Sequence, residues 1–454
     1  MTVVTCIDVG STFTKAAAVD PETGALLATA AHATTISTDV MTGIDATRSA
    51  LATQLPGVDL GAVLACSSAG GGLRLAVVGY ERGVTAEAGA RVGLSAGAKV
   101  VHVSAGELAA DSLAALAADR PDIVLLVGGT DGGNADVLLH NARQLALAHL
   151  EAPVVVAGNT EARDEVMRLL KDAGGPEPIA AANVLPRIGV LDPLPARLAI
   201  REVFIRHVIG GKHLSASSDF SAMVRAATPD AVLSGVELLA DGCGDVPGLG
   251  DVVVVDVGGA TTDVYSVVTP DPEEASLHRE VVEVLWRSRT VEGDLGVRWS
   301  APGVVEAALA ERLIDPAEAA MLGPAAALRA ADPGLLEVDL AGRAVDARLA
   351  ELALTVALRR HARPSDSGAV RFPGKDLRRV RLVVGSGGVL RHADPGTLAR
   401  ILGPARADHA GGWKVPDQAA LAVDAAYVLA AAGLLAADHP DAAARLATGA
   451  LVRL

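Results

Sequence analysis

The chain has 454 residues, more than one hydrophobic core usually supports, so we expect two large lobes, the first of them carrying an insertion. Its net charge of −15 repels nucleic-acid backbones and anionic membrane surfaces, so neither is an expected partner. Aromatic residues make up 2% of a chain that is 50% hydrophobic. Ala, Val and Leu must therefore build the core, which predicts an α/β fold of sheets covered by helices.

The three cysteines, Cys6, Cys66 and Cys243, are too far apart in sequence for a CxxC metal site or a disulfide framework. The N-terminus lacks a basic stretch followed by an apolar segment, and no uncharged apolar run reaches the roughly 18 residues of a membrane span. These features favour a reducing compartment. We expect a cytoplasmic protein that is neither secreted nor membrane-spanning.

The first recognisable element is a hairpin whose turn suits a phosphate. An apolar strand at residues 3–7 precedes Asp-Val-Gly-Ser-Thr-Phe-Thr-Lys at residues 8–15. Gly10 lets the backbone approach a phosphate, and Asp8 would face it favourably only through Mg²⁺, with Lys15 as a nearby positive charge. Taken alone, the string also fits an ordinary turn. The hydroxyl groups expected to bind phosphate belong to Ser11, Thr12 and Thr14.

Between the two lobes' hairpins, apolar runs at residues 122–127 and 152–157 predict buried strands of βαβ units. Asp131 lies in the glycine turn that follows the first of these strands. It would either position the attacking water or metal-bound waters, or simply form the turn, and the sequence leaves both readings open. The glycines at residues 70–72 fit either a phosphate nest or a loop that contacts a partner.

A second hairpin repeats the first. Residues 256–263 read Asp-Val-Gly-Gly-Ala-Thr-Thr-Asp after a run of four valines, and Asp256 follows Asp8 by 248 residues. A repeat at this distance predicts a duplicated domain, with lobes at residues 1–245 and 246–454 and Asp256 facing Asp8 and the same metal across a cleft. The phosphate-binding residues expected in this turn are Gly258, Gly259, Thr261 and Thr262.

The remaining elements complete the second lobe. Glu292 and Asp294 would either reach the cleft or cap the following helix, and capping is favoured. A helical region spans about residues 302–363, and a C-terminal helix is expected at about residues 417–435. Between them, an apolar strand leads into a glycine turn whose backbone would pass close to a base or ribose. The residues of this turn are Gly385, Ser386, Gly387 and Gly388.

The three turns resemble the phosphate-1, phosphate-2 and adenosine motifs of the acetate kinase, sugar kinase, Hsp70 and actin superfamily. The resemblance implies two duplicated ribonuclease H-like lobes around a cleft that binds ATP and Mg²⁺, with Asp8, Asp131 and Asp256 as catalytic candidates. Within that superfamily, four further strings are similar to the glutamate mutase accessory protein family, the methylaspartate mutase L component, often labelled MutL. These strings are residues 66–74, 126–134, 183–186 and 289–296.

That family resemblance implies an ATP-dependent, chaperone-like protein that reactivates an adenosylcobalamin-dependent mutase, whose subunits are the expected partners. Cobalamin is expected on the mutase, because the nearest Asp-x-His-x-x-Gly match, at residues 205–210, begins with Ile. Alternatives are a small-molecule kinase for a sugar or carboxylate, an activator of radical dehydratases, and a nucleotide sensor with negligible turnover. The mismatch-repair ATPase that shares the MutL label has motifs of another type. The oligomeric state is left open.

Overall fold

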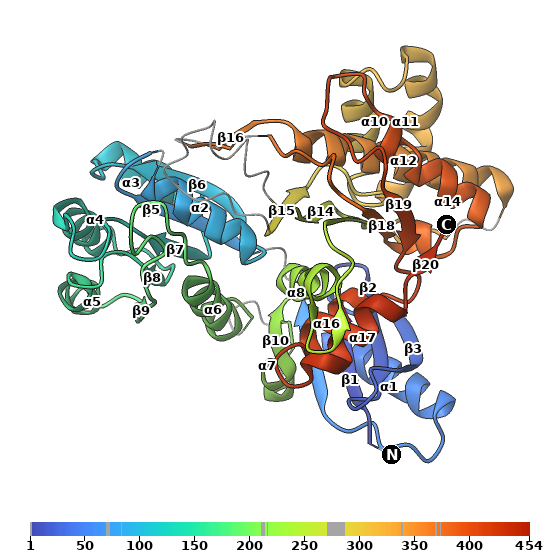
Figure 1. Cartoon of the computed structure of the whole chain (residues 1–454), viewed down its shortest axis with the longest axis horizontal. Helices are drawn as coiled ribbons and strands as arrows, with labels where there is room; N and C mark the ends of the chain where they lie inside the picture. The colour runs from blue at the N-terminus through green and yellow to red at the C-terminus, as the bar shows by residue number, and fades with distance from the viewer. Residues whose placement is uncertain are drawn as a thin grey trace.

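The computed structural model describes residues 2–69, 73–82, 84–209, 214–215, 217–269, 287–336, 339–367, 370–372 and 374–454. Three main sheets with helices packed around them confirm the α/β prediction (Figure 1). Two of the sheets belong to the duplicated lobes, and the third lies in the chain between two strands of the first.

The first-lobe sheet has the strand order β10-β4-β1-β2-β3. Strands β1 to β3 form an antiparallel meander, and β4 and β10 run parallel to β1 on its other side. Strand β1 is buried along its whole length, as its apolar sequence predicts for a central strand. Helix α1 (Val40–Gln54) covers one face. The strands are β1 (Val4–Val9), β2 (Phe13–Val19), β3 (Leu26–Ala33), β4 (Val63–Ser67) and β10 (Val224–Ala227).

The second-lobe sheet repeats this topology in the order β15-β14-β13-β18-β19-β20. Strands β13 to β15 form the meander, β18 and β19 run parallel to β13, and β20 adds an antiparallel edge. Two copies of one strand order confirm the duplicated lobes. The strands are β13 (Val252–Val257), β14 (Thr262–Val267), β15 (Arg287–Glu292), β18 (Leu382–Ser386), β19 (Ala420–Val423) and β20 (Val452–Arg453). The helices on this lobe are α10 (Ala301–Ala310), α11 (Pro316–Ala331), α12 (Leu340–Ala362), α13 (Gly388–Arg391), α14 (Pro395–Leu402) and α15 (Pro404–Ala407).

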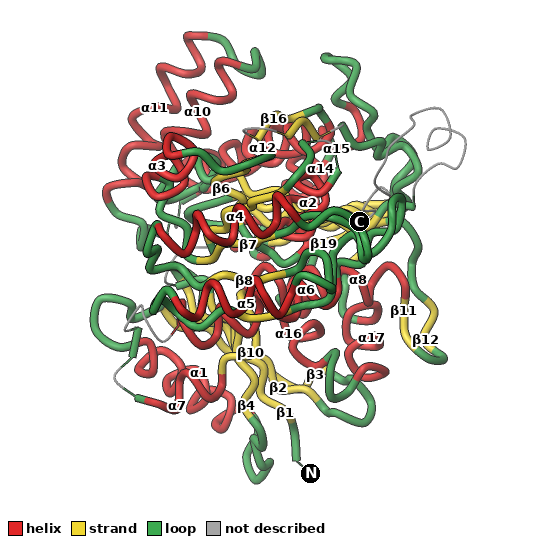
Figure 2. The backbone as a smooth tube through the Cα atoms, turned by 90° about the vertical axis from the view of Figure 1, so that its left-hand side faces the viewer, coloured by secondary structure: helices red, strands yellow, loops and turns green. Residues whose placement is uncertain are grey.

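The third sheet is entirely parallel, in the order β6-β5-β7-β8-β9, and contains the strands expected at residues 122–127 and 152–157. Helices α4 and α5 lie side by side over it (Figure 2). Its strands are β5 (Arg74–Gly79), β6 (Lys99–Ala105), β7 (Ile123–Leu126), β8 (Val154–Val156) and β9 (Ile179–Ala180). Its helices are α2 (Thr85–Ser95), α3 (Ala110–Ala118), α4 (Asp136–Leu147), α5 (Arg163–Asp172) and α6 (Leu194–Val203), followed by the π-helix η1 (Phe204–Ile209) and α7 (Ser218–Met223).

Helices α8 (Thr228–Asp241), α16 (Val428–Leu435) and α17 (Pro440–Gly449) form the core between the lobes. One hydrophobic cluster joins Val4 of the first sheet to Val254 of the second through these helices. Helices α8 and α16 cross in backbone contact, because a Cβ on Gly235 would lie 2.0 Å from the Leu429 carbonyl oxygen. The expected helix at residues 417–435 is partly wrong, since β19 occupies its first part.

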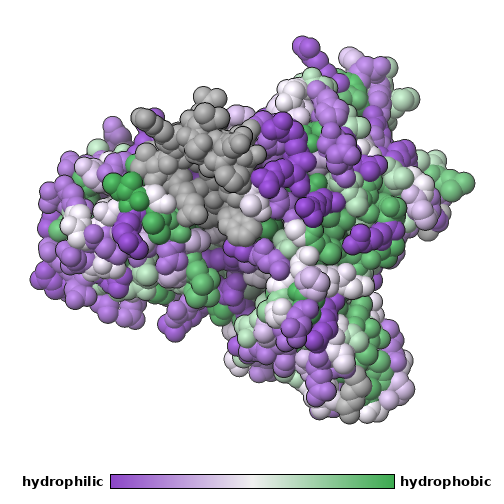
Figure 3. All heavy atoms as spheres, viewed as in Figure 1, coloured by the Kyte–Doolittle hydropathy of each residue, from purple (hydrophilic) through white to green (hydrophobic). Residues whose placement is uncertain are grey.

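Two short hairpins complete the described elements. The strands of the first are β11 (Gly242–Cys243) and β12 (Val246–Pro247), and those of the second are β16 (Ser365–Ser367) and β17 (Val370–Phe372). The predicted division between residues 245 and 246 falls in the turn of the first hairpin and stays a prediction. Hydrophobic residues reach the surface of both lobes in groups interrupted by hydrophilic ones (Figure 3). Of the described helices, none is both long and apolar enough to cross a membrane.

Candidate functional site

The two Asp–Gly turns have the same local geometry. Asp8 lies opposite Lys15 in the register of its hairpin, and Asp256 lies opposite Asp263 at the equivalent position. The Gly10 amide donates to the Phe13 carbonyl oxygen at 3.1 Å, and the Gly258 amide donates to that of Thr261 at 2.9 Å. The duplication therefore extends from strand order down to the hydrogen bond that closes each turn.

The two turns also touch each other. The Thr12 hydroxyl is buried and has no hydrogen-bond partner among the described residues. It lies 3.0 Å from the position that a Cβ on Gly259 would take. A side chain at residue 259 would press on this hydroxyl, so the glycine allows the turns of the two lobes to approach closely.

Asp8 is buried and well supplied with donors. Lys15 Nζ lies 3.2 Å from its Oδ2, and the Thr228 hydroxyl donates to its Oδ1 at 2.7 Å. The Cys66 thiol donates to the same oxygen at 3.6 Å, and burial raises the pKa of that thiol well above its usual range, so it stays protonated. No sequence pattern points to Thr228, which lies 220 residues after Asp8. Cys66 is found only through the register that pairs β1 with β4.

Asp256 is in the opposite situation. Its Oδ1 is buried without a hydrogen-bond partner among the described residues. Burial raises its pKa to about 6; Asp263 and Asp8 add to this rise, while Lys15 and a hydrogen bond from Ser386 oppose it. An unsatisfied carboxylate oxygen beside a second carboxylate is the kind of group that a bound cation would satisfy.

A small cavity beside Asp8 is lined by Lys15, Arg391 and Tyr427. Lys15 Nζ lies 3.8 Å from the centre of the Tyr427 ring, and the Arg391 guanidinium lies 5.6 Å from it. Burial lowers the pKa of Lys15, but Tyr427, Asp8 and Asp256 raise it more, so the ammonium stays charged. Tyr427 has a positive φ of 58°, a strained conformation for a bulky residue, at the start of α16. The sequence reasoning missed it.

The third glycine turn adjoins Asp256. Ser386 ends β18 directly beside Asp256 in the register of the sheet, and Gly385 lies beside Val255. A Cβ on Gly387 would lie 2.2 Å from the Val257 carbonyl oxygen, whereas one on Gly388 would meet nothing within 4 Å. Gly387 therefore packs against the protein itself, and Gly388 faces open space.

Several predicted hydroxyls support the turns from within the protein. Thr14 is buried and bonds to Thr34, which in turn donates to the Gly10 carbonyl oxygen at 2.8 Å. Thr262 is also buried and donates to the Leu295 carbonyl oxygen at 2.6 Å. The Thr261 hydroxyl donates to Asp263 at 3.0 Å, and Ser11 is partly exposed in its turn.

Asp131 is not brought to this cluster. It follows β7 in the third sheet, where its Oδ1 accepts hydrogen bonds from Asn183 Nδ2 at 2.9 Å and the Thr160 amide at 3.0 Å. Burial raises its pKa, but these hydrogen bonds lower it more. These contacts fit the turn-forming reading, and a catalytic role for Asp131 together with Asp8 and Asp256 stays a prediction. The glycines at residues 70–72 lie outside the described residues.

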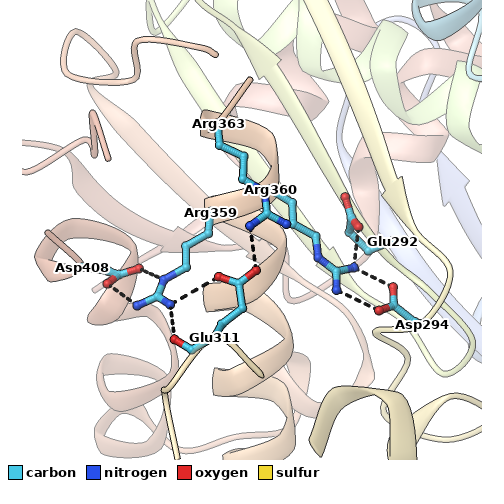
Figure 4. Close-up of polar contacts among 7 residues, drawn as sticks. All are labelled: Glu292, Asp294, Glu311, Arg359, Arg360, Arg363 and Asp408. Carbon is cyan, nitrogen blue, oxygen red and sulfur yellow. Dashed lines mark hydrogen bonds and ion pairs between the residues drawn. The ribbon is translucent and has the colours of Figure 1, made fainter. Parts of the chain in front are cut away.

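Glu292 and Asp294 do not cap the helix that follows, α10, whose N-cap residue is Ser300. Both pair with Arg360 of α12, at 2.8 Å and 2.7 Å (Figure 4). Close by on the same helix, Arg359 pairs with both Glu311 and Asp408, and Arg363 pairs with Glu311. Beyond this cluster the chain returns to the second turn: the Val297 and Arg298 amides donate to the Gly258 and Gly259 carbonyl oxygens. The family-like string at residues 289–296 is thus followed directly by two residues whose amides hydrogen-bond to that turn and support it.

The repeated sheet, the helices shared between the lobes and the facing Asp–Gly turns define the two-lobed ribonuclease H-like fold of actin, Hsp70 and the sugar kinases. The chain belongs to the MutL protein family, the accessory proteins of glutamate mutase, whose family model matches residues 4–451. It is 37% identical to Protein MutL of Clostridium tetanomorphum over 472 aligned positions, which cover 99% of each chain.

Solved structures show a weaker similarity. Acetone carboxylase in its nucleotide-free structure aligns with 96% of this chain and 70% of its own, at a TM-score of 0.40 and 16% identity. Xylulose kinase of Bifidobacterium adolescentis aligns with 100% of this chain and 95% of its own, at 0.32 and 13%. The fold assignment therefore rests on the strand order of the two sheets and not on these alignments.

Proposed function

We propose that this protein is an ATP-dependent, chaperone-like accessory protein that reactivates an adenosylcobalamin-dependent mutase of the glutamate mutase type. The observation that carries the nucleotide part is the pair of matching turns that bring Asp8 and the unsatisfied Asp256 together between two lobes. Membership of the MutL family supports the mutase subunits as partners.

The residues present fit a magnesium nucleotide. Asp8 and Asp256 would hold the metal, which would supply the charge that lets phosphates approach two carboxylates. Among the described residues no three His, Cys, Asp or Glu side chains group into a metal site, so phosphate and water would complete the coordination. Phosphate oxygens would be bound by the turn donors and by Lys15, once its ammonium leaves Asp8. The adenosine would lie against the glycine turn at residues 385–388.

ATP hydrolysis would give the lobes two states, and a partner that binds these states with different affinity would be remodelled by the change. The reaction requires Asp8 and Asp256 but not Asp131, which lies in another sheet. Hydrolysis in the absence of a phosphate acceptor also distinguishes this function from that of a kinase.

The test uses the cognate mutase inactivated with hydroxocobalamin. Fresh adenosylcobalamin is added with this protein, and recovery of mutase activity is followed with ATP, without ATP, and with Asp256→Asn. Of these three conditions, we expect recovery only in the first, the parent protein with ATP. Asp131→Asn is the matched control, because it makes the same change outside the cleft, and it should retain recovery.

Two results would contradict the proposal. One is recovery that is independent of ATP and of Asp256. The other is no recovery under any condition while the purified protein phosphorylates a sugar or carboxylate, which would establish the kinase alternative.

A further inference from the structure

One corner of the inserted third sheet contacts both lobes beside their acidic turns. The corner is the link between α2 and β6, residues 96–98, and we call it the Gly97 corner. Its Gly97 carbonyl oxygen accepts a hydrogen bond from Arg289 Nη1 of the second lobe at 2.5 Å. A Cβ on Gly97 would lie 2.8 Å from the Asp230 amide nitrogen, so the corner also packs closely on the first turn of α8.

The contact with the second lobe leads directly to its acidic turn. Arg289 is 5% exposed, and its Nε and Nη2 donate to Asp263 Oδ1 at 2.8 Å and 2.5 Å. Asp263 lies opposite Asp256 in the hairpin, and its other oxygen accepts from the Thr261 hydroxyl. A single guanidinium group therefore spans the turn of the second lobe and the Gly97 corner.

The contact with the first lobe leads in the same way to Asp8. The first residue of α8, Thr228, donates to Asp8 Oδ1 at 2.7 Å. Two residues further on, Asp230 is 2% exposed and pairs with Arg197 at 3.0 Å and Arg201 at 2.5 Å, both from α6 of the inserted unit. The inserted unit thus contacts the first turn of α8, which supports Asp8, in two places: through the Gly97 corner and through the arginines of α6.

We propose that the Gly97 corner couples the nucleotide site to the inserted sheet, with Arg289 as the positioning residue that transmits the coupling. The inference rests on the proposed nucleotide binding, and it says how binding at that site would affect the inserted sheet. A buried guanidinium group cannot leave one partner unpaired without a large loss of stability. A nucleotide-dependent shift of the second turn therefore pulls on the corner through Arg289, while Thr228 and Asp230 tie the same corner to the other lobe.

The experiment is amide hydrogen exchange of the full-length protein with and without Mg-ADP, whose binding is measured separately by calorimetry. In the parent protein we expect Mg-ADP to slow exchange about fivefold or more in α2, the Gly97 corner and β6. Arg289→Lys keeps the positive charge near Asp263, but one ammonium group cannot span both partners. We expect this variant to bind Mg-ADP and to lose the change in exchange.

Arg287→Lys is the matched control, since Arg287 lies two residues earlier on the same strand and pairs with Asp241 and Glu237 of α8. It should keep the response of the parent. Mg-ADP binding without any change of exchange in the parent, or a full response in Arg289→Lys, would overturn the coupling alone. No Mg-ADP binding at all would overturn the proposed nucleotide site and the coupling with it. If Arg289→Lys does not fold, the comparison within the parent still tests the coupling between the nucleotide site and the inserted sheet.

Discussion

At the scale of single residues, two aspartates with equivalent places in the duplicated lobes have unlike surroundings. Asp8 receives donors from Lys15, Thr228 and Cys66, whereas Asp256 has an oxygen without a partner among the described residues. Such a group destabilises the folded chain when it is ionised and unbound, and a bound cation would satisfy it.

The raised pKa of Asp256 predicts a stability that depends on pH. Its carboxyl group titrates near 6 in the folded chain instead of at 3.8, so the free energy of unfolding falls as the pH rises from about 4 to about 6 and stays reduced above it. We expect Asp256→Asn to stabilise the metal-free protein at pH 7.5 by up to about 3 kcal/mol. The gain should shrink towards pH 4. Denaturant unfolding at several pH values measures it, and a variant less stable than the parent throughout would contradict it.

Gly387 and Gly388 predict different outcomes for the same substitution. Gly387→Ala should destabilise the fold by more than about 1 kcal/mol, because φ is +114° and the new methyl group would collide with the Val257 carbonyl oxygen. Gly388→Ala should change stability by less than about 0.5 kcal/mol. It should nevertheless weaken ATP binding by crowding the adenosine. Thermal unfolding and calorimetry separate the two effects, and unchanged ATP affinity in Gly388→Ala would remove the adenosine assignment.

At the scale of elements, the crossing of α8 and α16 holds the lobes together through reciprocal glycines. A Cβ on Gly433 would lie 1.8 Å from the Ala231 carbonyl oxygen, matching the contact of Gly235 with Leu429. Both helices contribute to the hydrophobic cluster that joins the two central strands. Their separation therefore sets how closely the two sheets approach.

This crossing predicts that Gly433→Ala destabilises the protein by about 1–3 kcal/mol, because the added methyl group forces the helix backbones apart. Gly323 provides the control. It lies inside α11, and a Cβ there would meet nothing within 4 Å. Gly323→Ala should therefore stabilise by up to about 1 kcal/mol through helix propensity. Chemical denaturation measures both, and a neutral Gly433→Ala would show that the helices can separate without loss.

Local patterns predicted the hairpins well, because a strand, an Asp–Gly turn and a second strand are contiguous in sequence. The sequence could not predict which sheet Asp131 belongs to, since order along the chain does not reveal that β5 to β9 form a separate sheet. The parts of Thr228 and Tyr427 in the site could not be predicted for a related reason. Thr228 reaches the site from the first turn of α8 and Tyr427 from the N-cap of α16, and both helices are remote from Asp8 in sequence. Ala420–Val423 was misread because its Ala-rich sequence suits a buried helix as well as a strand.

At the scale of the whole molecule, the proposed nucleotide site lies where the two lobes meet, so ligand binding and stability should be linked. At 100 times its dissociation constant, Mg-ADP should add about 2.7 kcal/mol to the free energy of unfolding. Removing Mg²⁺ with EDTA should abolish most of this gain in stability. The Asp8→Asn substitution should do the same. Thermal shift measurements decide it, and equal stabilisation by ADP with and without Mg²⁺ would argue against a metal held by Asp8 and Asp256.

The place of the inserted sheet also affects how the protein is made. Strand β4 ends at residue 67, but its neighbour β10 begins only at residue 224, after the whole third sheet. At a synthesis rate of about 5–20 residues per second, the edge of β4 stays unpaired on the ribosome for about 8–30 s. An unpaired edge strand invites association with other chains. Helix α16, which packs against β1, emerges later still. The lobe that the ribosome begins first is therefore among the last parts of the protein to finish folding.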